Sequence, residues 1–552
     1  MNKIRLSSVH LIILIAVFII IANNQVLWVR LSERLDLFSL QGLGFTLTYL
    51  LYLSGSLALV FLLFGQKYTL KALLVLFVMV ASITSYFSQQ LGVIFNEDMI
   101  RNIAETIRDN NHQEAFELVS TPLVLHVLLF GVLPSVFIVM AKVTYKTAGK
   151  ELLTRSTYAV GILLVLAAMI MLNFKYVAYF TRENRDLRVY VTPEYPIKSS
   201  LKFFRGRLVT KEDTYKRIGE DAKQVKISPK RTVGIMVIGE TARADHFSLN
   251  GYNKQTNPRL NKLNIINYTN AYSCGTSTAY SVPCMFSFFN RDEYTPDKAG
   301  SISNVLDVLE TSGVKVIWID NNSSCKGVCR RIDNINLRDN LVKNSPFYNR
   351  GEYFDEALLD HLDKHINNTK SDILIVLHTL GSHGPKYFKR FPDTFAAFKP
   401  YCTRSAPQEC DASEIVNAYD NTILYTDYIL SKTIKYLKEN NSNYNSFMVY
   451  FSDHGESLGE DGIYLHGLPY FLAPEAQTHV PLIVWFSDYF ADDNNIDITE
   501  LQYKREKEYS HDNLSYSLLG LFNVKTSLYD RELDIFHTHK KLGLSDSTSH
   551  GS

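Results

Sequence analysis

The hydrophobic positions along the chain follow two patterns that change near residue 180. Before this point, five apolar runs approach or exceed the roughly 20 residues that cross a bilayer, near 9–29, 43–65, 70–92, 122–142 and 157–179. Five such runs in succession predict a membrane module of five helices rather than buried helices of a soluble protein. The first run has no obvious small-x-small cleavage site, so we interpret it as an uncleaved anchor and not as a signal peptide.

The lysines and arginines predict how this module lies in the membrane. They precede the first run and fall between runs two and three and between runs four and five: Lys3, Arg5, Lys67, Lys71, Lys142, Lys146, Lys150 and Arg155. The loop 96–120 instead carries six carboxylates against two arginines. Because cytoplasmic loops are enriched in Lys and Arg, we expect the N-terminus inside and residues 180–552 on the outer side.

After residue 230, short apolar and β-rich runs alternate with polar stretches long enough to be helices. The predicted strands are 232–238, 314–319, 372–378, 446–451 and 480–486. This alternation indicates an α/β sheet covered by helices on both faces. The chain therefore divides into a transmembrane domain (1–182), a polar linker (183–230) and an α/β domain (231–552).

The linker mixes aromatic and basic residues. Phe203 and Phe204 stand among Lys202, Arg205 and Arg207. A helix with this composition is able to rest on anionic lipid headgroups. A solvated connector is the alternative.

Composition narrows the partners and the compartment. Lys and Arg total 57 against 56 Asp and Glu, so the basic surface of a nucleic-acid-binding protein is not expected. The six cysteines all lie in the C-terminal half and in close pairs, namely Cys274 with Cys284, Cys325 with Cys329, and Cys402 with Cys410. We expect local disulfides, which persist in oxidising compartments such as the periplasm. Other connectivities are open, and zinc binding is the alternative for the pair at 325–329.

Polar residues able to bind a metal follow three of the predicted strands: Glu240 and Thr241 after 232–238, Thr379, Ser382 and His383 after 372–378, and Ser452, Asp453, His454 and Glu456 after 446–451. Ligands gather at the carboxyl ends of strands in α/β sheets, so these groups converge if the strands are parallel. Mixed oxygen and nitrogen ligands suit zinc with one position left for a reacting oxygen. Taken singly, each residue is as well explained by a turn or a helix cap; their joint occurrence favours a metal site.

A nucleophile is expected in the segment CGTSTAYSVPC at 274–284. It offers three hydroxyls, Thr276, Ser277 and Thr278, directly before a predicted helix, and a helix N-terminus favours a bound phosphate. A neutral alcohol is a poor nucleophile, and coordination to a metal favours its alkoxide. The residues alone leave the choice among the three hydroxyls open, and a plain N-cap is the alternative.

Five segments in this order resemble the lipid A phosphoethanolamine transferases, a group that includes the mobile colistin-resistance enzymes. They are GETARADHFSLNGY (239–252), CGTSTAYSVPCMFS (274–287), LHTLGSHGP (377–385), AYDN (418–421) and SDHGESLGE (452–460) with His466. The similarity runs across the whole chain. It implies a catalytic domain similar to alkaline phosphatases and sulfatases, although the C-x-P-x-R signature of sulfatases is missing from this sequence.

The resemblance also implies roles for individual residues. The zinc ligands of the family fall on Glu240, Thr278, Asp453 and His454, so that Thr278 is both ligand and nucleophile. His383 and His466 match histidines that contact the substrate headgroup or a second zinc ion. Further positions lining the site fall on Asn322, Lys326 and His378.

The reaction implied by the resemblance is a two-step transfer. Phosphatidylethanolamine gives its phosphoethanolamine group to the threonine, and a phosphate of lipid A takes it over. The product carries less negative charge at the cell surface, which favours polymyxin resistance. A monomer in the inner membrane of a Gram-negative cell, with its catalytic domain in the periplasm and in contact with membrane lipids, is expected.

Alternatives remain at this stage. They are transfer of phosphoethanolamine or phosphoglycerol to another glycan acceptor (lipopolysaccharide core, Kdo or glucan), release of the group to water by a phosphodiesterase, and a non-catalytic membrane scaffold.

Overall fold

The structure is a computed structural model that describes residues 5–36, 39–108, 118–172, 174–209, 215–349 and 351–538. The chain forms two compact units, one of residues 1–100 and 119–205 and the other of residues 101–118 and 206–552. The boundary near residue 205 falls inside the segment predicted as a linker. Part of the acidic loop, residues 109–117, lies outside the described residues.

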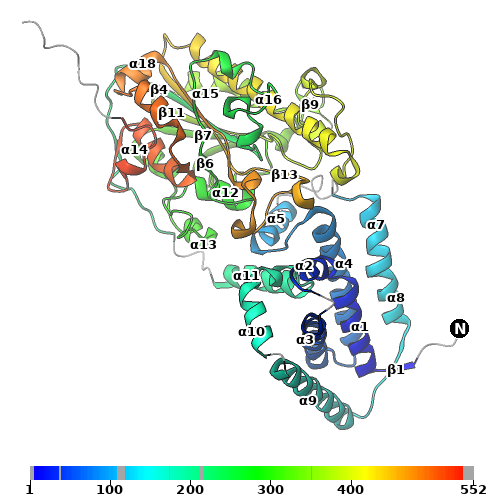
Figure 1. The fold of residues 1–552 in the computed structure, drawn as a ribbon. Coiled ribbons are helices and arrows are strands. Elements are labelled where there is room, and N and C mark those ends of the chain that lie inside the picture. Colours follow the sequence, from blue (N-terminus) through cyan, green and yellow to red (C-terminus); the bar gives the residue numbers. More distant parts are fainter. Residues whose placement is uncertain are drawn as a thin grey trace, which may run out of the picture. The chain divides into compact units, whose positions relative to one another are not determined.

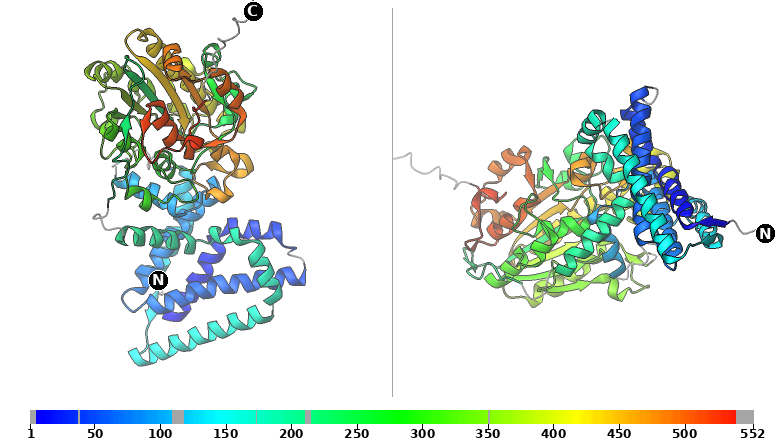
Figure 2. Two further views of the ribbon diagram at one scale, coloured as in Figure 1. Left: turned by 90° about the vertical axis from the view of Figure 1, so that its left-hand side faces the viewer. Right: turned by 90° about the horizontal axis from the view of Figure 1, so that it is seen from below.

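Long apolar helices build the N-terminal unit (Figures 1 and 2). Four helical stretches are long and apolar enough to cross a membrane: α3 (Leu40–Phe64), α4 (Leu70–Leu91), Thr121–Met140 and α9 (Ala148–Leu172). The first predicted run instead forms α1 (Ser8–Ala22) and α2 (Gln25–Arg34), which are bent by 61°. The described residues thus hold four spans, or five if the bent pair is counted as one, and the prediction of five is not confirmed.

Asn24 explains the bend between α1 and α2. Its side-chain amide donates to the carbonyl of Ile19 at 3.1 Å and to that of Thr192 at 2.8 Å, and its carbonyl accepts from the Thr192 amide at 2.7 Å. Side chains that hydrogen-bond to the backbone compete with helical hydrogen bonds. The helix therefore ends inside the run that the sequence predicts as a single span.

Two further predicted runs differ from simple helices. The stretch Thr121–Met140 consists of α7 (Thr121–Val127), a π-helical turn (Leu128–Val132) and α8 (Leu133–Met140). Pro134 follows the turn and has no amide hydrogen for the helical ladder, a frequent reason for such irregularity. The run predicted at 157–179 is divided between α9 and α10 (Phe174–Glu183).

The predicted linker contains regular structure. It holds a 3-10 helix (Arg185–Tyr190), α11 (Glu194–Val209) and β3 (Lys223–Gln224). Phe203 is buried and Phe204 is exposed, so the two aromatic side chains do not form one outward-facing surface.

A seven-stranded sheet organises the C-terminal unit, in the order β5-β15-β12-β4-β11-β7-β8. All five predicted strands are present, as β4 (Thr232–Gly239), β7 (Lys315–Asp320), β11 (Ile373–His378), β12 (Asn445–Ser452) and β15 (Leu482–Phe486). The edge strands β5 (Ile266–Tyr268) and β8 (Asp333–Asn336) were not predicted, because they are short and β8 has the polar sequence DNIN. The strands from β12 to β8 are parallel, and β15 is antiparallel to β12.

Helices cover both faces of this sheet (Figure 1). Successive side chains of a strand point to opposite faces. Met236 and Ile238 of β4 belong to a core with α12 (Thr278–Met285), α14 (Val305–Ser312) and α20 (Leu514–Leu521). Ile235 and Val237 of the same strand belong to a second core with α15 (Leu362–Asn368) and α16 (Ala412–Glu439). The predicted α/β fold with helices on both faces is confirmed.

The strand register brings four carboxyl ends to one edge of the sheet. Gly239 of β4 is paired with Ser452 of β12. On the other side of β4, Ile238 is paired with His378 of β11. His378 is in turn paired with Asp320 of β7. The residues that follow these strands therefore emerge side by side.

The cysteines form three disulfides, Cys274–Cys284, Cys325–Cys329 and Cys402–Cys410. These are the local pairs that the sequence predicts. Zinc binding by the pair at 325–329 is excluded by its disulfide.

Candidate metal and nucleophile centre

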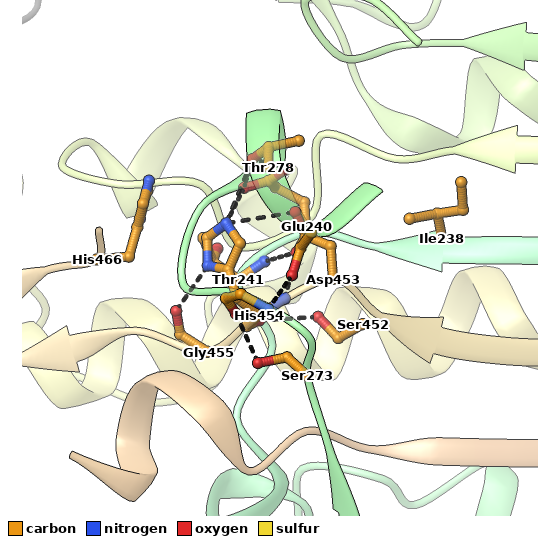
Figure 3. Close-up of polar contacts among 12 residues, drawn as sticks. Ile238, Glu240, Thr241, Ser273, Thr278, Ser452, Asp453, His454, Gly455 and His466 are labelled. Carbon is orange, nitrogen blue, oxygen red and sulfur yellow. Dashed lines mark hydrogen bonds and ion pairs between the residues drawn. The ribbon is translucent and has the colours of Figure 1, made fainter. Parts of the chain in front are cut away.

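Three ligand side chains meet beyond the ends of β4 and β12. Glu240 follows β4, and Asp453 and His454 follow β12. One ligand atom from each lies within 4.8 Å of the others, and all three side chains are buried. Figure 3 shows them pointing toward one another below Thr278. The parallel arrangement of the two strands is what brings together residues more than 200 positions apart.

Local hydrogen bonds orient the ligand atoms. The Oδ1 atom of Asp453 accepts from the amides of Thr241 at 3.1 Å and of His454 at 2.7 Å. Its Oδ2 atom is buried with no hydrogen-bond partner among the described residues. The Nδ1–H of His454 donates to the carbonyl of Gly455 at 2.9 Å, which leaves the lone pair on Nε2. This Nε2 atom lies 3.3 Å from Asp453 Oδ2 and 3.7 Å from Glu240 Oε1.

The electrostatics of this group favour a cation. Burial and the neighbouring charge of Asp453 raise the pKa of Glu240 well above its usual value. Burial also raises the pKa of Asp453 and lowers that of His454, whose ring is therefore neutral. Two buried carboxylates and an imidazole lone pair that face one another are unfavourable by themselves. They match the mixed oxygen and nitrogen donor set that zinc prefers.

Thr278 stands at the first turn of α12 and faces this group. Its Oγ1 atom lies 3.1 Å and 3.2 Å from the two carboxylate oxygens of Glu240 and 3.3 Å from Nε2 of His454. The neighbouring hydroxyls are used differently. Thr276 donates to the carbonyl of Leu468 at 2.6 Å. Ser277 occupies the N-cap position of α12, but its buried Oγ atom makes no capping hydrogen bond and has no hydrogen-bond partner among the described residues. Of the three candidate hydroxyls, Thr278 is the one that hydrogen-bonds to the ligand group.

Asn322 and His378 lie beside the ligand group at the ends of neighbouring strands. The amide of Asn322 donates to Glu240 Oε2 at 2.7 Å, so this residue orients a ligand directly. His378 is fully buried at the end of β11, and its Nδ1–H donates to Asp320 at 3.1 Å. The imidazole of His378 contacts β7 in this way and is not part of the ligand group.

His466 and His383 line the other side of the group. The ring centroid of His466 is 4.4 Å from that of His454 and 5.7 Å from that of His383. The Nδ1–H of His466 donates to Glu456 at 2.7 Å, and Glu456 also accepts from the hydroxyl of Tyr387 at 2.7 Å. Although burial opposes its charge, Glu456 raises the pKa of His466 to about 9.

Lys326, the last of the predicted site residues, lies on the loop closed by the Cys325–Cys329 disulfide. Its Nζ atom is 2.5 Å from the hydroxyl of Ser323, which directly follows Asn322. Lys326 therefore lies next to the ligand group without belonging to it.

Comparisons with known proteins agree with this geometry. The family "Phosphoethanolamine transferase EptA/EptB" matches residues 53–208, and the family "Sulfatase" matches residues 233–524. The protein "Phosphoethanolamine transferase EptA" of Escherichia coli strain K12 is 36% identical over 542 residues, which are 96% of this chain and 97% of that protein. The chain belongs to the phosphoethanolamine transferase family.

Two further members of this phosphoethanolamine transferase family extend the comparison. "Phosphatidylethanolamine transferase Mcr-1" of Escherichia coli is 37% identical over 527 residues, covering 92% of this chain and 94% of that protein. The solved structure of the integral membrane lipooligosaccharide phosphoethanolamine transferase A of Neisseria meningitidis has 34% identity and a TM-score of 0.91. The structural alignment covers 97% of this chain and 99% of the Neisseria meningitidis chain.

Several residues that shape the site in this transferase were not predicted as site residues. Thr241 has a φ angle of +52° and Gly381 of +48°. A Cβ atom on Gly381 would lie 2.7 Å from the carbonyl of Glu240, so a glycine is needed there. Glu456 acts through hydrogen bonds to His466 and to the more distant Tyr387, and His511 acts through hydrogen bonds to the backbone of Cys274 and Ser452. The sequence places Glu456 among the polar residues after the strand 446–451 but gives no role for it, and no sequence signal points to His511.

Proposed function

We propose that this chain transfers phosphoethanolamine from phosphatidylethanolamine to a phosphate group of lipid A through a covalent phosphoethanolamine–threonine intermediate at Thr278. The observation that carries this proposal is the placement of the Thr278 hydroxyl against Glu240 and His454, beside Asp453. Family membership supports the choice of donor group. The relative named "Kdo(2)-lipid A phosphoethanolamine 7''-transferase" of Salmonella typhimurium supports an acceptor that contains lipid A, and the choice of a phosphate group on it is part of this proposal.

In the first step, the hydroxyl of Thr278 gives up its proton and Oγ1 attacks the phosphorus of the donor. The bond from phosphorus to the glycerol oxygen breaks, and diacylglycerol leaves as an alcohol after that oxygen takes up a proton. In the second step, a phosphate oxygen of the acceptor attacks the same phosphorus, the bond to Thr278 breaks, and the threonine hydroxyl is restored. Each step exchanges one P–O bond for another, so no oxidant or reductant is required.

The ligand group is suited to zinc, which would be held by Glu240, Thr278, Asp453 and His454. When bound, zinc would supply positive charge that favours the alkoxide form of Thr278 and offsets charge on the phosphoryl oxygens. The residues around it have supporting roles. Asn322 orients Glu240, and Glu456 orients His466. Lys326 and His466 bring positive charge toward the phosphoryl group. His383 is a candidate for the ethanolamine headgroup or for a second zinc ion.

We also propose that the chain lies in the inner membrane with its C-terminal unit in the periplasm. The positions of Lys and Arg between the apolar runs support this orientation, and the three disulfides support an oxidising compartment. Both substrates are lipids, so a membrane-anchored enzyme meets them in the plane of the bilayer. The predicted domain limits (1–182, 183–230 and 231–552) are kept as part of this proposal.

The first prediction tests the nucleophile. In Thr278→Ala, we expect transfer to fall by at least about 10³-fold, because the attacking atom is lost. Intact-lipid mass spectrometry of lipid A from cells expressing each variant measures the product. Mass spectrometry of the purified full-length protein, incubated with donor alone, measures the covalent adduct.

Thr276→Ala is the matched control, because it removes a buried hydroxyl two positions away that bonds to Leu468. It should keep both the adduct and the modified lipid A. Wild-type activity in Thr278→Ala would disprove the nucleophile assignment. The proposed acceptor would be wrong if phosphoethanolamine were found only on core oligosaccharide. It would also be wrong if repeated donor turnover, beyond the first threonine adduct, did not depend on any acceptor lipid.

A further inference from the structure

A cavity of about 810 Å³ opens beside the helix that carries Thr278. Its walls come from the first turns of α12, from the segment 294–304 and from the loop 326–331, and residues of the segment 101–108 complete it. All of the lining residues belong to the C-terminal compact unit. Its volume falls in the range of small-molecule binding sites.

Positive charge dominates the described lining of this cavity. Five cationic side chains line it against the two carboxylates of Glu105 and Asp297: Arg101, Arg108, Lys326, Arg330 and Arg331. One further carboxylate, Asp307, pairs with Arg331 from outside the lining. Counting Asp307 as well, the cations exceed the anions by two. Such a cavity attracts a multiply charged anion.

Two of the basic side chains are held in place before any ligand binds. Arg331 donates to both carboxylate oxygens of Asp307, at 2.9 Å and 2.6 Å, and its guanidinium lies 4.4 Å from the ring centroid of Tyr215. The Tyr215 hydroxyl is in turn 2.9 Å from that of Ser303. Lys326 is on the short loop closed by the Cys325–Cys329 disulfide. Pre-organised arginine and lysine groups of this kind recognise phosphate oxygens.

The cavity adjoins the candidate active site. Ala279, which directly follows Thr278, is part of its lining. So is Lys326, whose ammonium group contacts Ser323 beside the Glu240-binding residue Asn322. An anion bound in the cavity is therefore a near neighbour of a phosphoryl group on Thr278.

We propose that this cavity is an anionic subsite of the acceptor, which binds a phosphate of a phosphorylated glycolipid other than the phosphate that receives the phosphoethanolamine group. The inference rests on the function proposed above. The donor is a poor occupant, because its single phosphate must lie at Thr278 for reaction and its ammonium group would be repelled by the excess of cations. An acceptor with two phosphates is able to place one at Thr278 and the other in the cavity.

The test uses the full-length protein in detergent with phosphatidylethanolamine as donor. Arg330→Gln removes one of the positive charges that line the cavity, and Arg330→Lys keeps a positive charge at this position. We expect Arg330→Gln to raise the KM for bisphosphorylated lipid A by about tenfold, because one charge-assisted hydrogen bond to phosphate is lost. Arg330→Lys should raise this KM by a smaller factor, because the positive charge is kept. Cleavage of donor in the absence of acceptor should stay at the wild-type rate.

Arg404→Gln is the matched control, because Arg404 is an exposed arginine on another disulfide-closed loop, 402–410, outside the cavity. It should leave every parameter unchanged. With monophosphorylated lipid A that keeps only the reacting phosphate, wild type and Arg330→Gln should have the same raised KM, because the second phosphate is missing.

Several results would overturn the subsite. An unchanged acceptor KM in Arg330→Gln would show that the cavity does not bind acceptor. An equal loss of acceptor-free donor cleavage would assign the cavity to the donor. Suppose that added phosphatidylglycerol inhibited the wild type but not Arg330→Gln, while the acceptor KM was the same in both. The cavity would then bind an anionic bilayer lipid and not the acceptor. These results differ from a failure of the proposed function itself. In that case the wild-type protein would modify neither bisphosphorylated nor monophosphorylated lipid A.

Discussion

The imidazole of His511 connects the two segments that carry the proposed chemistry. The amide of Cys274 donates to its Nδ1 atom at 3.0 Å, so the ring proton is on Nε2, which donates to the carbonyl of Ser452 at 2.9 Å. Cys274 begins the segment that leads to Thr278, and Ser452 immediately precedes Asp453. Burial lowers the pKa of His511 to about 3, so the ring stays neutral and keeps both hydrogen bonds.

At this residue scale we predict that His511→Ala destabilises the fold and slows the reaction. Two buried backbone groups lose their partner, which costs about 2–4 kcal/mol of unfolding free energy. The Thr278 segment also loses its attachment to β12, so formation of the threonine adduct should slow. Denaturant unfolding and the adduct-forming rate, measured well below the melting temperature, check the two effects.

The control for this prediction is His479→Ala. His479 is only half-buried and donates a single hydrogen bond, from Nε2 to the carbonyl of Thr269 at 2.8 Å. The loss of stability should be smaller, and the adduct should form at the normal rate. A His511→Ala variant with wild-type stability and adduct formation would contradict the role assigned to His511.

At the scale of elements, α12 depends on its surroundings more than on its own helical propensity. It has eight residues, which is too short for an isolated helix to be stable in water. Val282 and Met285 bury it against the sheet, and the Cys274–Cys284 disulfide closes the segment that leads into it. The hydroxyl of Thr278 is positioned by these tertiary contacts.

We predict that removal of this disulfide affects both stability and activity. In Cys274→Ala/Cys284→Ala, the chain gains loop entropy in the unfolded state, which lowers the unfolding free energy by about 3 kcal/mol for a loop of this length. The transfer rate should also fall, because Thr278 is less well positioned. Thermal unfolding of the full-length protein and the lipid A transfer assay measure the two changes.

The Cys402–Cys410 pair offers a matched comparison, with a sequence separation of 8 against 10. Cys402→Ala/Cys410→Ala should lose a similar amount of stability while the transfer rate of the folded protein is retained. Equal losses of activity in the two double variants would show that the effect is general destabilisation and not the position of Thr278.

At the scale of the whole molecule, the ligand group joins segments that are far apart in the sequence. Glu240 comes from the end of β4, Thr278 from α12, and Asp453 and His454 from the end of β12. A cation bound there would cross-link three parts of the C-terminal unit. It would also relieve the repulsion between the buried carboxylates.

We therefore predict that zinc stabilises the protein apart from its role in catalysis. Chelation should lower the melting temperature of the full-length protein and abolish transfer, and zinc should restore both. At a free zinc concentration about 1,000 times the Kd, the stabilisation is about 4 kcal/mol. Elemental analysis and thermal unfolding with and without zinc measure the stoichiometry and the shift.

Two variants separate this effect from general destabilisation. Asp453→Asn should melt at a temperature that zinc no longer changes. Asp534→Asn alters a half-buried carboxyl group that accepts from the hydroxyl of Tyr529 at 2.7 Å and is not part of the ligand group. This variant should keep the full zinc response. The metal assignment is wrong if the demetallated protein transfers at the normal rate.

Local patterns in the sequence determined the elements of the fold and the candidate residues. The five strands, the three cysteine pairs and the positions of Glu240, Asp453 and His454 after strand ends all follow from short-range hydropathy and spacing. Residues close in sequence remain close in space, so such features are readable without a structure. The bend at Asn24 was missed because it depends on a hydrogen bond to Thr192, which is distant in sequence.

Only the tertiary structure decided which of these residues meet. The pairing of Gly239 with Ser452 brings Glu240 to Asp453. The packing of α12 places the hydroxyl of Thr278, and not that of Thr276, against the ligand group, a choice that the sequence left open. The partners of His511 and Glu456, and the basic cavity beside Thr278, likewise depend on strand order and helix packing. These contacts join positions tens to hundreds of residues apart, and the hydrophobic pattern of a single chain does not specify such pairings.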